Sequence, residues 1–83
     1  MSDELTRRVL GMFAEVGRDV LDLHELFEAG GNDPDARRGV FYAVESLVER
    51  GLLEERGNDF YALTEAGREA AASSGGGEEG ESL

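Results

Sequence analysis

The longest amphipathic pattern in this chain, at about residues 34–50, constrains its fold more than any other feature. Asp33-Pro34 is a strong helix opening, because the carboxylate can cap free N–H groups and the fixed φ of proline suits the first helical position. Apolar residues then recur at helical spacing until Gly51. The pattern predicts one continuous helix with a buried face, which consists of Val40, Phe41, Val44, Leu47 and Val48.

A β-hairpin pattern follows this helix directly. Residues 52–56 and 60–63 have the composition of short strands, and Gly57-Asn58-Asp59 between them is typical of a hairpin turn. Because alternate residues of a strand point to the same side, Tyr61 and Leu63 are expected to share the inward face.

The first helical pattern runs over residues 5–16. Gly17 is a natural end for this helix, because glycine accepts the left-handed conformation that closes helices. Leu10 lies beside the apolar stripe and widens it beyond what a one-sided contact requires. We therefore expect a homodimer with this helix at the interface. The stripe itself consists of Leu5, Val9, Met12, Phe13 and Val16.

A second, short helix is expected from Leu23 to about Ala29. Asp22 and Glu25 have the spacing of a capping box, in which each side chain accepts a hydrogen bond from a backbone N–H group of the other residue. Gly30-Gly31 ends the segment. Val20-Leu21, just before it, is too short to assign.

The order of these elements predicts a mainly α protein with a small β-hairpin, in the α+β class. Two helices set at a sharp angle, the second long and followed at once by a hairpin, form a winged helix-turn-helix. We expect a three-helix core, a wing and a last short helix from Glu65 to about Ala72, all in one domain over residues 1–72. Residues 73–83 are mostly Gly, Ser and Glu, which bury too little apolar surface to offset the entropy of ordering, so a disordered acidic tail is expected.

The composition argues against an enzyme and against a structural metal. A domain this short buries only about 60% of its unfolded surface, which leaves little room for a substrate cavity. The chain has no cysteine, and its single histidine, His24, is expected to form a solvent-facing pair with Glu28, since zinc needs three or four ligands. No nucleophile, base and oxyanion donor can be combined into a catalytic site, and no cofactor is expected. Without a signal-peptide core or a membrane-length apolar run, the protein is expected in the cytoplasm.

The net charge of −11 arises from 19 acidic residues against 8 basic ones, all of them arginine. The acidic residues are spread over every segment, as in halophilic proteins adapted to molar internal salt. At about 1 M salt the Debye length is near 3 Å, so only charges in near contact interact and the overall charge does not prevent DNA binding. The alternative is an ordinary acidic protein that a polyanion repels.

The sequence from Phe41 to Leu53, continued by Phe60 to Arg68, is similar to the PadR-like and MarR-like winged-helix regulators. Those families share an aromatic residue, then Leu-x-x-Leu-Glu-x-x-Gly-Leu, then a tyrosine and Leu-Thr-x-x-Gly-Arg. The match covers about Pro34 to Arg68 and is more specific for the fold than for one regulator. It implies a transcriptional regulator that binds double-stranded DNA.

Each element of the shared pattern has a structural reason. Gly51 lets the chain leave the long helix with a positive φ, and Leu52 is expected in the core. Thr64 is expected to cap the last helix, and Gly67 to allow its close packing.

The chain departs from these families at three places. The turn before the long helix is Gly30-Gly31-Asn32-Asp33-Pro34, the wing has one arginine, and no long dimerisation helix follows Arg68 in this sequence.

The exposed face of the long helix carries the first candidate DNA contacts. In helix-turn-helix docking the N-terminal part of the second helix enters the major groove. Arg38 is then the candidate for a guanine edge, Arg37 for a phosphate, and Tyr42 for a phosphate or a thymine methyl. Glu45 and Glu49, farther along, are expected to point away from the DNA backbone.

The wing, at about residues 54–61, provides the other candidates. Arg56 and Asn58 are placed to touch the sugar-phosphate backbone or the minor groove. Structural alternatives stay open: Arg38 can pair with Asp35, Tyr42 can simply cover the helix surface, and an exposed pair contributes only about 0.3–0.5 kcal/mol. For Tyr61, core packing is the expected role.

These observations favour a sequence-specific transcriptional regulator, with the recognition helix of about residues 34–50 in the major groove and the wing on the backbone. A homodimer would bind two half-sites about one helical turn apart. The alternative is a winged-helix protein-interaction module of a larger assembly, whose acidic surface meets a basic partner without direct DNA readout. The effector, if any, and the operator stay open.

Overall fold

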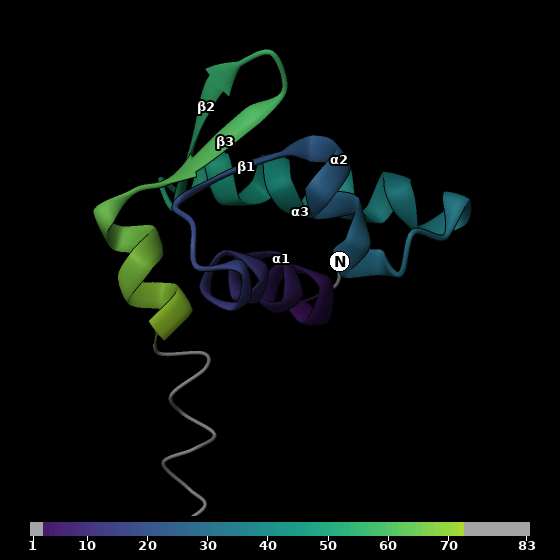
Figure 1. Ribbon diagram of the computed structural model, residues 1–83, viewed down its shortest axis with the longest axis horizontal. Coiled ribbons are helices and arrows are strands. Elements are labelled where there is room, and N and C mark those ends of the chain that lie inside the picture. Colours follow the sequence, from purple (N-terminus) through teal and green to yellow (C-terminus); the bar gives the residue numbers. More distant parts are fainter. Residues whose placement is uncertain (1–2, 73–83) are drawn as a thin grey trace, which may run out of the picture.

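The computed structural model describes residues 3–72, which form an α+β protein: mostly helical, with a three-stranded antiparallel sheet (Figure 1). The predicted tail, residues 73–83, lies outside the described residues. Over residues 3–72, no helix has the length and apolar character needed to cross a membrane. The elements are α1 (Asp3–Val16), β1 (Val20–Asp22), α2 (Leu23–Leu26), the 3-10 helix η1 (Phe27–Gly30), α3 (Pro34–Glu49), β2 (Leu53–Gly57), β3 (Phe60–Leu63) and a last helix over residues 65–72.

The sheet contains a strand that the sequence left unassigned. β1 pairs antiparallel with β3, with Leu21 opposite Tyr61, and β3 also pairs with β2, so the strand order is β1-β3-β2. The Leu23 N–H donates to the Asp59 carbonyl at 2.8 Å and extends this pairing. The prediction of a hairpin alone was therefore wrong. A strand of three residues has no periodicity of its own and forms only because β3 offers an edge.

The second helix is shorter than predicted, although its start is correct. The capping box is present: Asp22 Oδ1 accepts from the Glu25 N–H at 2.9 Å, and Glu25 Oε1 accepts from the Asp22 N–H at 3.1 Å. The α-helical part ends after four residues, however, and the chain tightens into η1. η1 packs closely on α3, because a Cβ at Gly30 would lie 2.9 Å from the Cβ of Ala36.

The third helix, α3, confirms the main prediction. It is continuous from Pro34 to Glu49, with Asp33 Oδ1 accepting from the Asp35 N–H at 3.1 Å as the N-cap. Gly39 does not break it. A Cβ there would lie 3.0 Å from Leu5 Cδ1, so this glycine lets α1 approach α3 closely.

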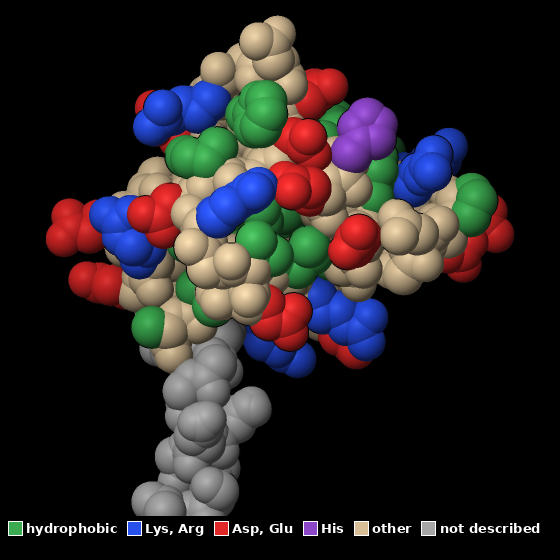
Figure 2. All heavy atoms as spheres, in the orientation of Figure 1, with side chains coloured by type: hydrophobic (Ala, Val, Ile, Leu, Met, Phe, Trp, Pro, Cys, Tyr) green, Lys and Arg blue, Asp and Glu red, His purple; other side chains and the backbone are tan. Residues whose placement is uncertain are grey.

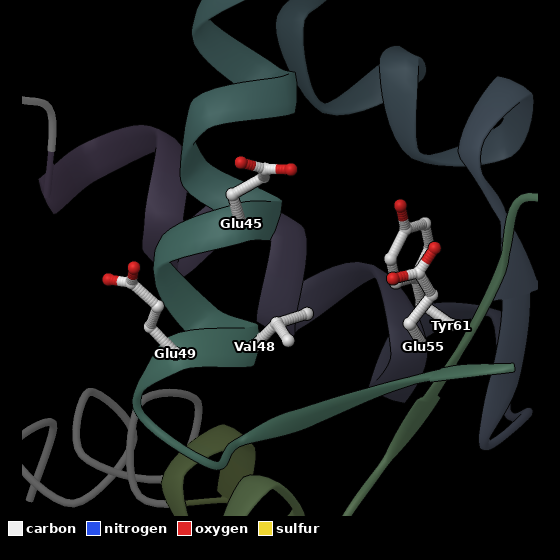
Figure 3. A pocket seen from close by; sticks show the side chains of 5 residues that line it. All are labelled: Glu45, Val48, Glu49, Glu55 and Tyr61. Carbon is white, nitrogen blue, oxygen red and sulfur yellow. The ribbon is translucent and has the colours of Figure 1, made fainter.

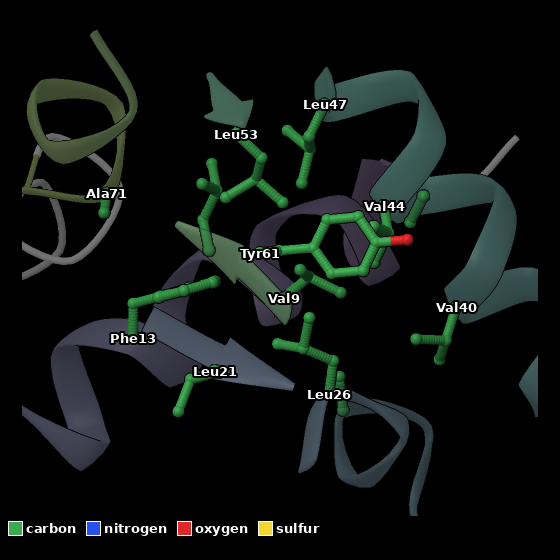
Figure 4. Packing of buried hydrophobic residues seen from close by; sticks show 13 residues of the cluster. Val9, Phe13, Leu21, Leu26, Val40, Val44, Leu47, Leu53, Tyr61 and Ala71 are labelled. Atoms are coloured by element: carbon green, nitrogen blue, oxygen red, sulfur yellow. The ribbon is translucent and has the colours of Figure 1, made fainter. Parts of the chain in front are cut away.

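The core lies between α1, α3 and the inner face of the sheet (Figure 4). Side chains from all seven labelled elements and from the last helix converge there, and Tyr61 projects from β3 toward α3 in the middle of the cluster. Leu63, also on the inward face, is half-buried and packs against it, as predicted. The buried cluster comprises Val9, Leu10, Phe13, Leu21, Leu26, Ala29, Val40, Ala43, Val44, Leu47, Leu53, Tyr61 and Ala71.

One predicted core position is wrong. Phe41 is 36% exposed, because the buried face of α3 is centred on Val40 and Val44 and takes in Ala43 on the other side. Leu52 is half-buried and packs against the core, as Leu63 does. Leu53, which the sequence did not single out, is 2% exposed and lies inside the core, because its side chain points inward where β2 begins.

The additional apolar surface of α1 is buried in the core of the same chain. Leu10 is 4% exposed and belongs to the core, so it does not widen a surface stripe. Among the described side chains of α1, Val16 is the large hydrophobic one that stays exposed, at 47%. The homodimer through α1 stays a prediction, but without the surplus apolar surface from which it was derived.

The last helix is tied to the turn that follows α3. Thr64 Oγ1 accepts from the Gly67 N–H at 3.0 Å, which confirms the predicted cap, and donates to the Gly51 carbonyl at 2.7 Å. Gly51 has a φ of +78°, as expected for its exit from α3. A Cβ at Gly67 would overlap the Leu52 carbonyl oxygen, so close packing requires glycine there, as predicted.

Candidate nucleic-acid interface

One face of α3 points to solvent and carries several predicted contacts. Arg38, Tyr42, Glu45 and Glu49 follow one another at helical spacing and are exposed, Tyr42 by 62%. The face therefore carries both signs of charge in its N-terminal half, where Asp35 precedes Arg38, and only carboxylates in its C-terminal half. On the side of the molecule shown in Figure 2, acidic and basic side chains are intermixed rather than gathered by sign.

Arg38 is free to bind. It is exposed, and within the described part of the chain it forms no hydrogen bond, ion pair or ring contact. The ion pair between Asp35 and Arg38, which was the structural alternative, is not formed. Its guanidinium therefore keeps all of its N–H donors available to a partner.

Arg37 is held against the body of the protein instead. Its Cζ lies 5.3 Å from the centroid of the Phe27 ring, in cation–π range. At an exposed site such a contact contributes about 0.5–1 kcal/mol, so it orients the guanidinium without occupying its N–H donors. Arg37 and Arg38 are thus neighbours in sequence with different roles: one is oriented by η1 and the other is unconstrained.

His24 takes part in the same small cluster. Its ring meets Phe27 edge-on, with 6.1 Å between the ring centroids. Within residues 3–72, no three His, Asp or Glu side chains are grouped so that they could hold a metal ion.

The arginine of the β2–β3 hairpin, which is the predicted wing, pairs with a carboxylate of its own strand. Arg56 Nε lies 3.4 Å from Glu54 Oε1, and both side chains are exposed, so this ion pair contributes at most about 1 kcal/mol. Asn58 lies at the turn with a φ of +53°, followed by Asp59 at +65°. On the inner face of β2 it is Glu55, paired in register with Tyr61, that faces α3.

Between α3 and the hairpin lies an acidic cleft of about 170 Å³ (Figure 3). Glu45, Val48 and Glu49 line it from α3, and Glu55 and Tyr61 line it from the sheet. Neither Glu55 nor Tyr61 was expected from the sequence to be a site residue. The strand alternation that places Leu53 and Tyr61 inward would have placed Glu55 on the same face.

Tyr61 joins the core to this cleft. Its side chain is only 5% exposed, yet its hydroxyl has no hydrogen-bond partner among the described residues and is not sealed from solvent. Burial raises the pKa of Tyr61 above 10.0, and the negative charges of Glu55, Asp59 and Glu45 raise it further. At neutral pH the hydroxyl therefore stays protonated.

We expect this shift to make the protein lose stability in alkali. The folded-state pKa of Tyr61 is above the unfolded value of 10.0, so the unfolded chain releases this proton first as the pH rises. The contribution of Tyr61 to the free energy of unfolding is therefore complete below pH 10.0 and is lost as the pH rises through the folded-state pKa. Urea midpoints at about pH 8 and about pH 10.5 should show a smaller alkaline loss for Tyr61→Phe than for the wild type. Tyr42→Phe, at the exposed tyrosine, is the control and should keep the wild-type loss. Equal losses in all three proteins would contradict the prediction.

The state of the arginines distinguishes Arg38 further. Four of the eight arginines of the chain form ion pairs within residues 3–72, and Arg37 lies over a ring. Arg7, Arg38 and Arg50 have no such partner there, and of these Arg38 lies on the exposed N-terminal half of α3.

The chain matches no family model, no curated protein and no solved structure.

Proposed function

We propose that this chain is a winged helix-turn-helix protein that binds double-stranded DNA and regulates transcription. The observation that carries the proposal is the unpaired Arg38 on the exposed N-terminal half of a continuous α3. The order of elements supports it: a helix, a strand, two helices and a hairpin whose second strand pairs with the first strand of the chain.

In this proposal the N-terminal half of α3 enters the major groove. The guanidinium of Arg38 donates two hydrogen bonds to the O6 and N7 of a guanine, and Tyr42, one turn later, contacts a phosphate or a thymine methyl. Arg37, oriented by Phe27, donates to a phosphate at the edge of the groove. Arg56 exchanges its exposed pairing with Glu54 for a phosphate at little cost.

The acidic half of α3 gives this interface an unusual dependence on salt. A basic DNA-binding surface loses affinity as salt rises, because released counterions drive its binding. Here Glu45, Glu49 and Glu55 repel the DNA backbone unless the repulsion is screened, which about 1 M salt does beyond about 3 Å. Binding is therefore best measured at molar KCl.

Arg38→Ala is expected to weaken specific DNA binding by about 1–3 kcal/mol, the usual contribution of a bidentate base contact. Arg7→Ala is the matched control, because it removes the same charge from an exposed and unpaired arginine of α1 and should leave affinity unchanged. Fluorescence anisotropy at about 1 M KCl, with a DNA fragment selected from a random-sequence library, measures both. Equal affinities for Arg38→Ala and the wild type would remove Arg38 from the interface. Equal losses of DNA affinity in Arg38→Ala and Arg7→Ala would show that Arg38 contributes only through the net charge.

A second function, a protein-interaction module without direct DNA readout, is favoured by the acidic cleft beside the hairpin. Selection from genomic DNA fragments and from a set of basic proteins, both at high salt, separates the two functions. Retention of DNA fragments alone would exclude the second.

A further inference from the structure

The cleft between α3 and the hairpin holds three carboxylates that nothing in the described structure neutralises. Glu4, Glu25 and Glu54 each form an ion pair with an arginine. The three glutamates of the cleft differ from these, because no hydrogen bond or ion pair joins any of them to a described residue. They are Glu45, Glu49 and Glu55.

This arrangement is electrostatically unfavourable as it stands. Glu45 and Glu49 are four residues apart on one helix, a spacing at which like charges destabilise the helix. Glu55 adds a third negative charge from the opposite wall (Figure 3). A bound cation would relieve this repulsion.

A second, independent feature points to a ligand. The Tyr61 side chain is 5% exposed, and its hydroxyl reaches the cleft without a hydrogen-bond partner in the described structure. Because solvent reaches this hydroxyl, a ligand in the cleft can contact it directly. The neutral phenol oxygen keeps lone pairs that accept a hydrogen bond, so the cleft offers a neutral acceptor as well as three anionic ones.

We propose that this cleft binds the guanidinium group of an arginine side chain presented by a basic protein partner. Its acceptors lie on two walls, and a planar guanidinium has five N–H donors that point in several directions, whereas an ammonium group is a compact and strongly hydrated point charge. Val48 and the Tyr61 ring supply apolar surface for the methylene stem of the arginine.

Size and charge select a protein side chain as the occupant. The cleft, at about 170 Å³, is smaller than the roughly 300 Å³ at which pockets for whole small molecules begin, so it suits one side chain. Its three carboxylates lie within contact range of an occupant, so they attract a positively charged side chain even where salt screens the overall charge. Arginine is also among the residues that most often anchor protein interfaces from within a pocket.

The inference does not depend on DNA binding. The cleft is formed by the C-terminal half of α3 and the hairpin, whereas the proposed base contact is Arg38 in the N-terminal half. Arg38→Ala should therefore bind an arginine peptide as the wild type does, and either proposal can fail without the other.

A titration of the full chain followed by ¹H–¹⁵N NMR tests the proposal. The probe is the peptide acetyl-Gly-Arg-Gly-amide, compared with the same peptide carrying lysine or the neutral isostere citrulline. We expect the amide shifts to concentrate at the residues that line the cleft, with the citrulline peptide binding at least about tenfold more weakly and the lysine peptide in between.

Three variants make the test specific. Glu55→Gln should weaken arginine binding about tenfold, whereas Glu15→Gln removes the same charge from an exposed residue of α1 and should change it little. Tyr61→Phe keeps the ring in the core and should weaken binding severalfold through loss of the hydroxyl. The arginine peptide should also lower the pKa of Tyr61, because a nearby positive charge favours the ionised phenol and offsets the effect of Glu55, Asp59 and Glu45, which raise this pKa. Tyrosinate absorbance in a Tyr42→Phe background measures the change.

Two outcomes would overturn the proposal. One is a set of shifts spread over the whole acidic surface, with Glu15→Gln weakening binding as much as Glu55→Gln. The other is equal binding of the arginine and citrulline peptides, since the cleft would then not recognise charge.

Discussion

Gly67→Ala is expected to destabilise the folded domain by about 3 kcal/mol or more, a large fraction of the roughly 5–15 kcal/mol by which folded domains are usually stable. A methyl group at this position would overlap the backbone carbonyl oxygen of Leu52 and approach Leu63 Cδ2 at 3.0 Å. The leucine side chain can rotate away, but the carbonyl cannot. It accepts a hydrogen bond from the Thr64 N–H at 3.2 Å, so moving it would break the link between the last helix and the turn after α3.

Gly11→Ala is the matched control for this substitution. A Cβ at Gly11 would meet no atom within 4 Å, and the residue lies inside α1. Alanine there should stabilise the protein by about 0.5–1 kcal/mol, because it restricts the unfolded chain and favours the helix. Urea unfolding followed by circular dichroism measures both variants. A Gly67→Ala protein as stable as the wild type would show that the last helix does not pack on Leu52 as described.

Leu21→Ala is expected to cost about 2–5 kcal/mol of unfolding free energy. Leu21 has an exposed fraction of 0% and lies on β1 opposite Tyr61, with its side chain in the core (Figure 4). Truncation would leave a cavity beneath the sheet as well as removing apolar contact. The loss tests whether β1 is an integral part of the domain or only a connection between α1 and α2.

Val20→Ala provides the comparison within the same strand. Val20 neighbours Leu21 but points to the opposite face of the sheet, where it is 37% exposed. Its truncation should cost less than about 1 kcal/mol, since little buried surface is lost. If both variants lost the same stability, the strand would not have the orientation described, and its contribution would come from the backbone alone.

The two functional proposals divide α3 between them. Its N-terminal half offers an unpaired arginine, an exposed tyrosine follows near its midpoint, and its C-terminal half forms one wall of the acidic cleft. Arg38→Ala and Glu55→Gln act on different halves of this surface. Measuring both variants against both DNA and the arginine peptide therefore assigns each binding event to its own set of residues.

The sequence predicted well whatever depends on neighbouring residues. Asp33-Pro34 opens α3, the Asp22–Glu25 box opens α2, and Thr64 caps the last helix, because each of these contacts joins groups within three residues of one another. Gly51 adopts a positive φ for an equally local reason. The exposure of Arg38 and Tyr42 also followed from helical spacing alone.

The candidate site was only partly accessible from the sequence. Spacing along α3 identifies Arg38 as exposed but cannot show that Arg37 lies over Phe27, because that contact requires η1 to pack beside α3. In the same way, the hairpin pattern singles out Arg56, whose DNA contact stays a prediction, but it did not lead us to Glu55 as the hairpin residue that faces α3.

The amino-acid sequence by itself determined that α1 and α3 form, where α2 begins, the caps of α2, α3 and the last helix, and the turn of the hairpin, since hydrogen bonds and apolar periodicity within a few residues specify them. Tertiary structure decided which apolar side chains are buried, turned Val20–Asp22 into a strand, shortened α2 and placed Glu55 and Tyr61 opposite α3. These features depend on contacts between residues far apart in the chain. Their free energy comes from surfaces that meet only after the elements pack, so no local pattern records them.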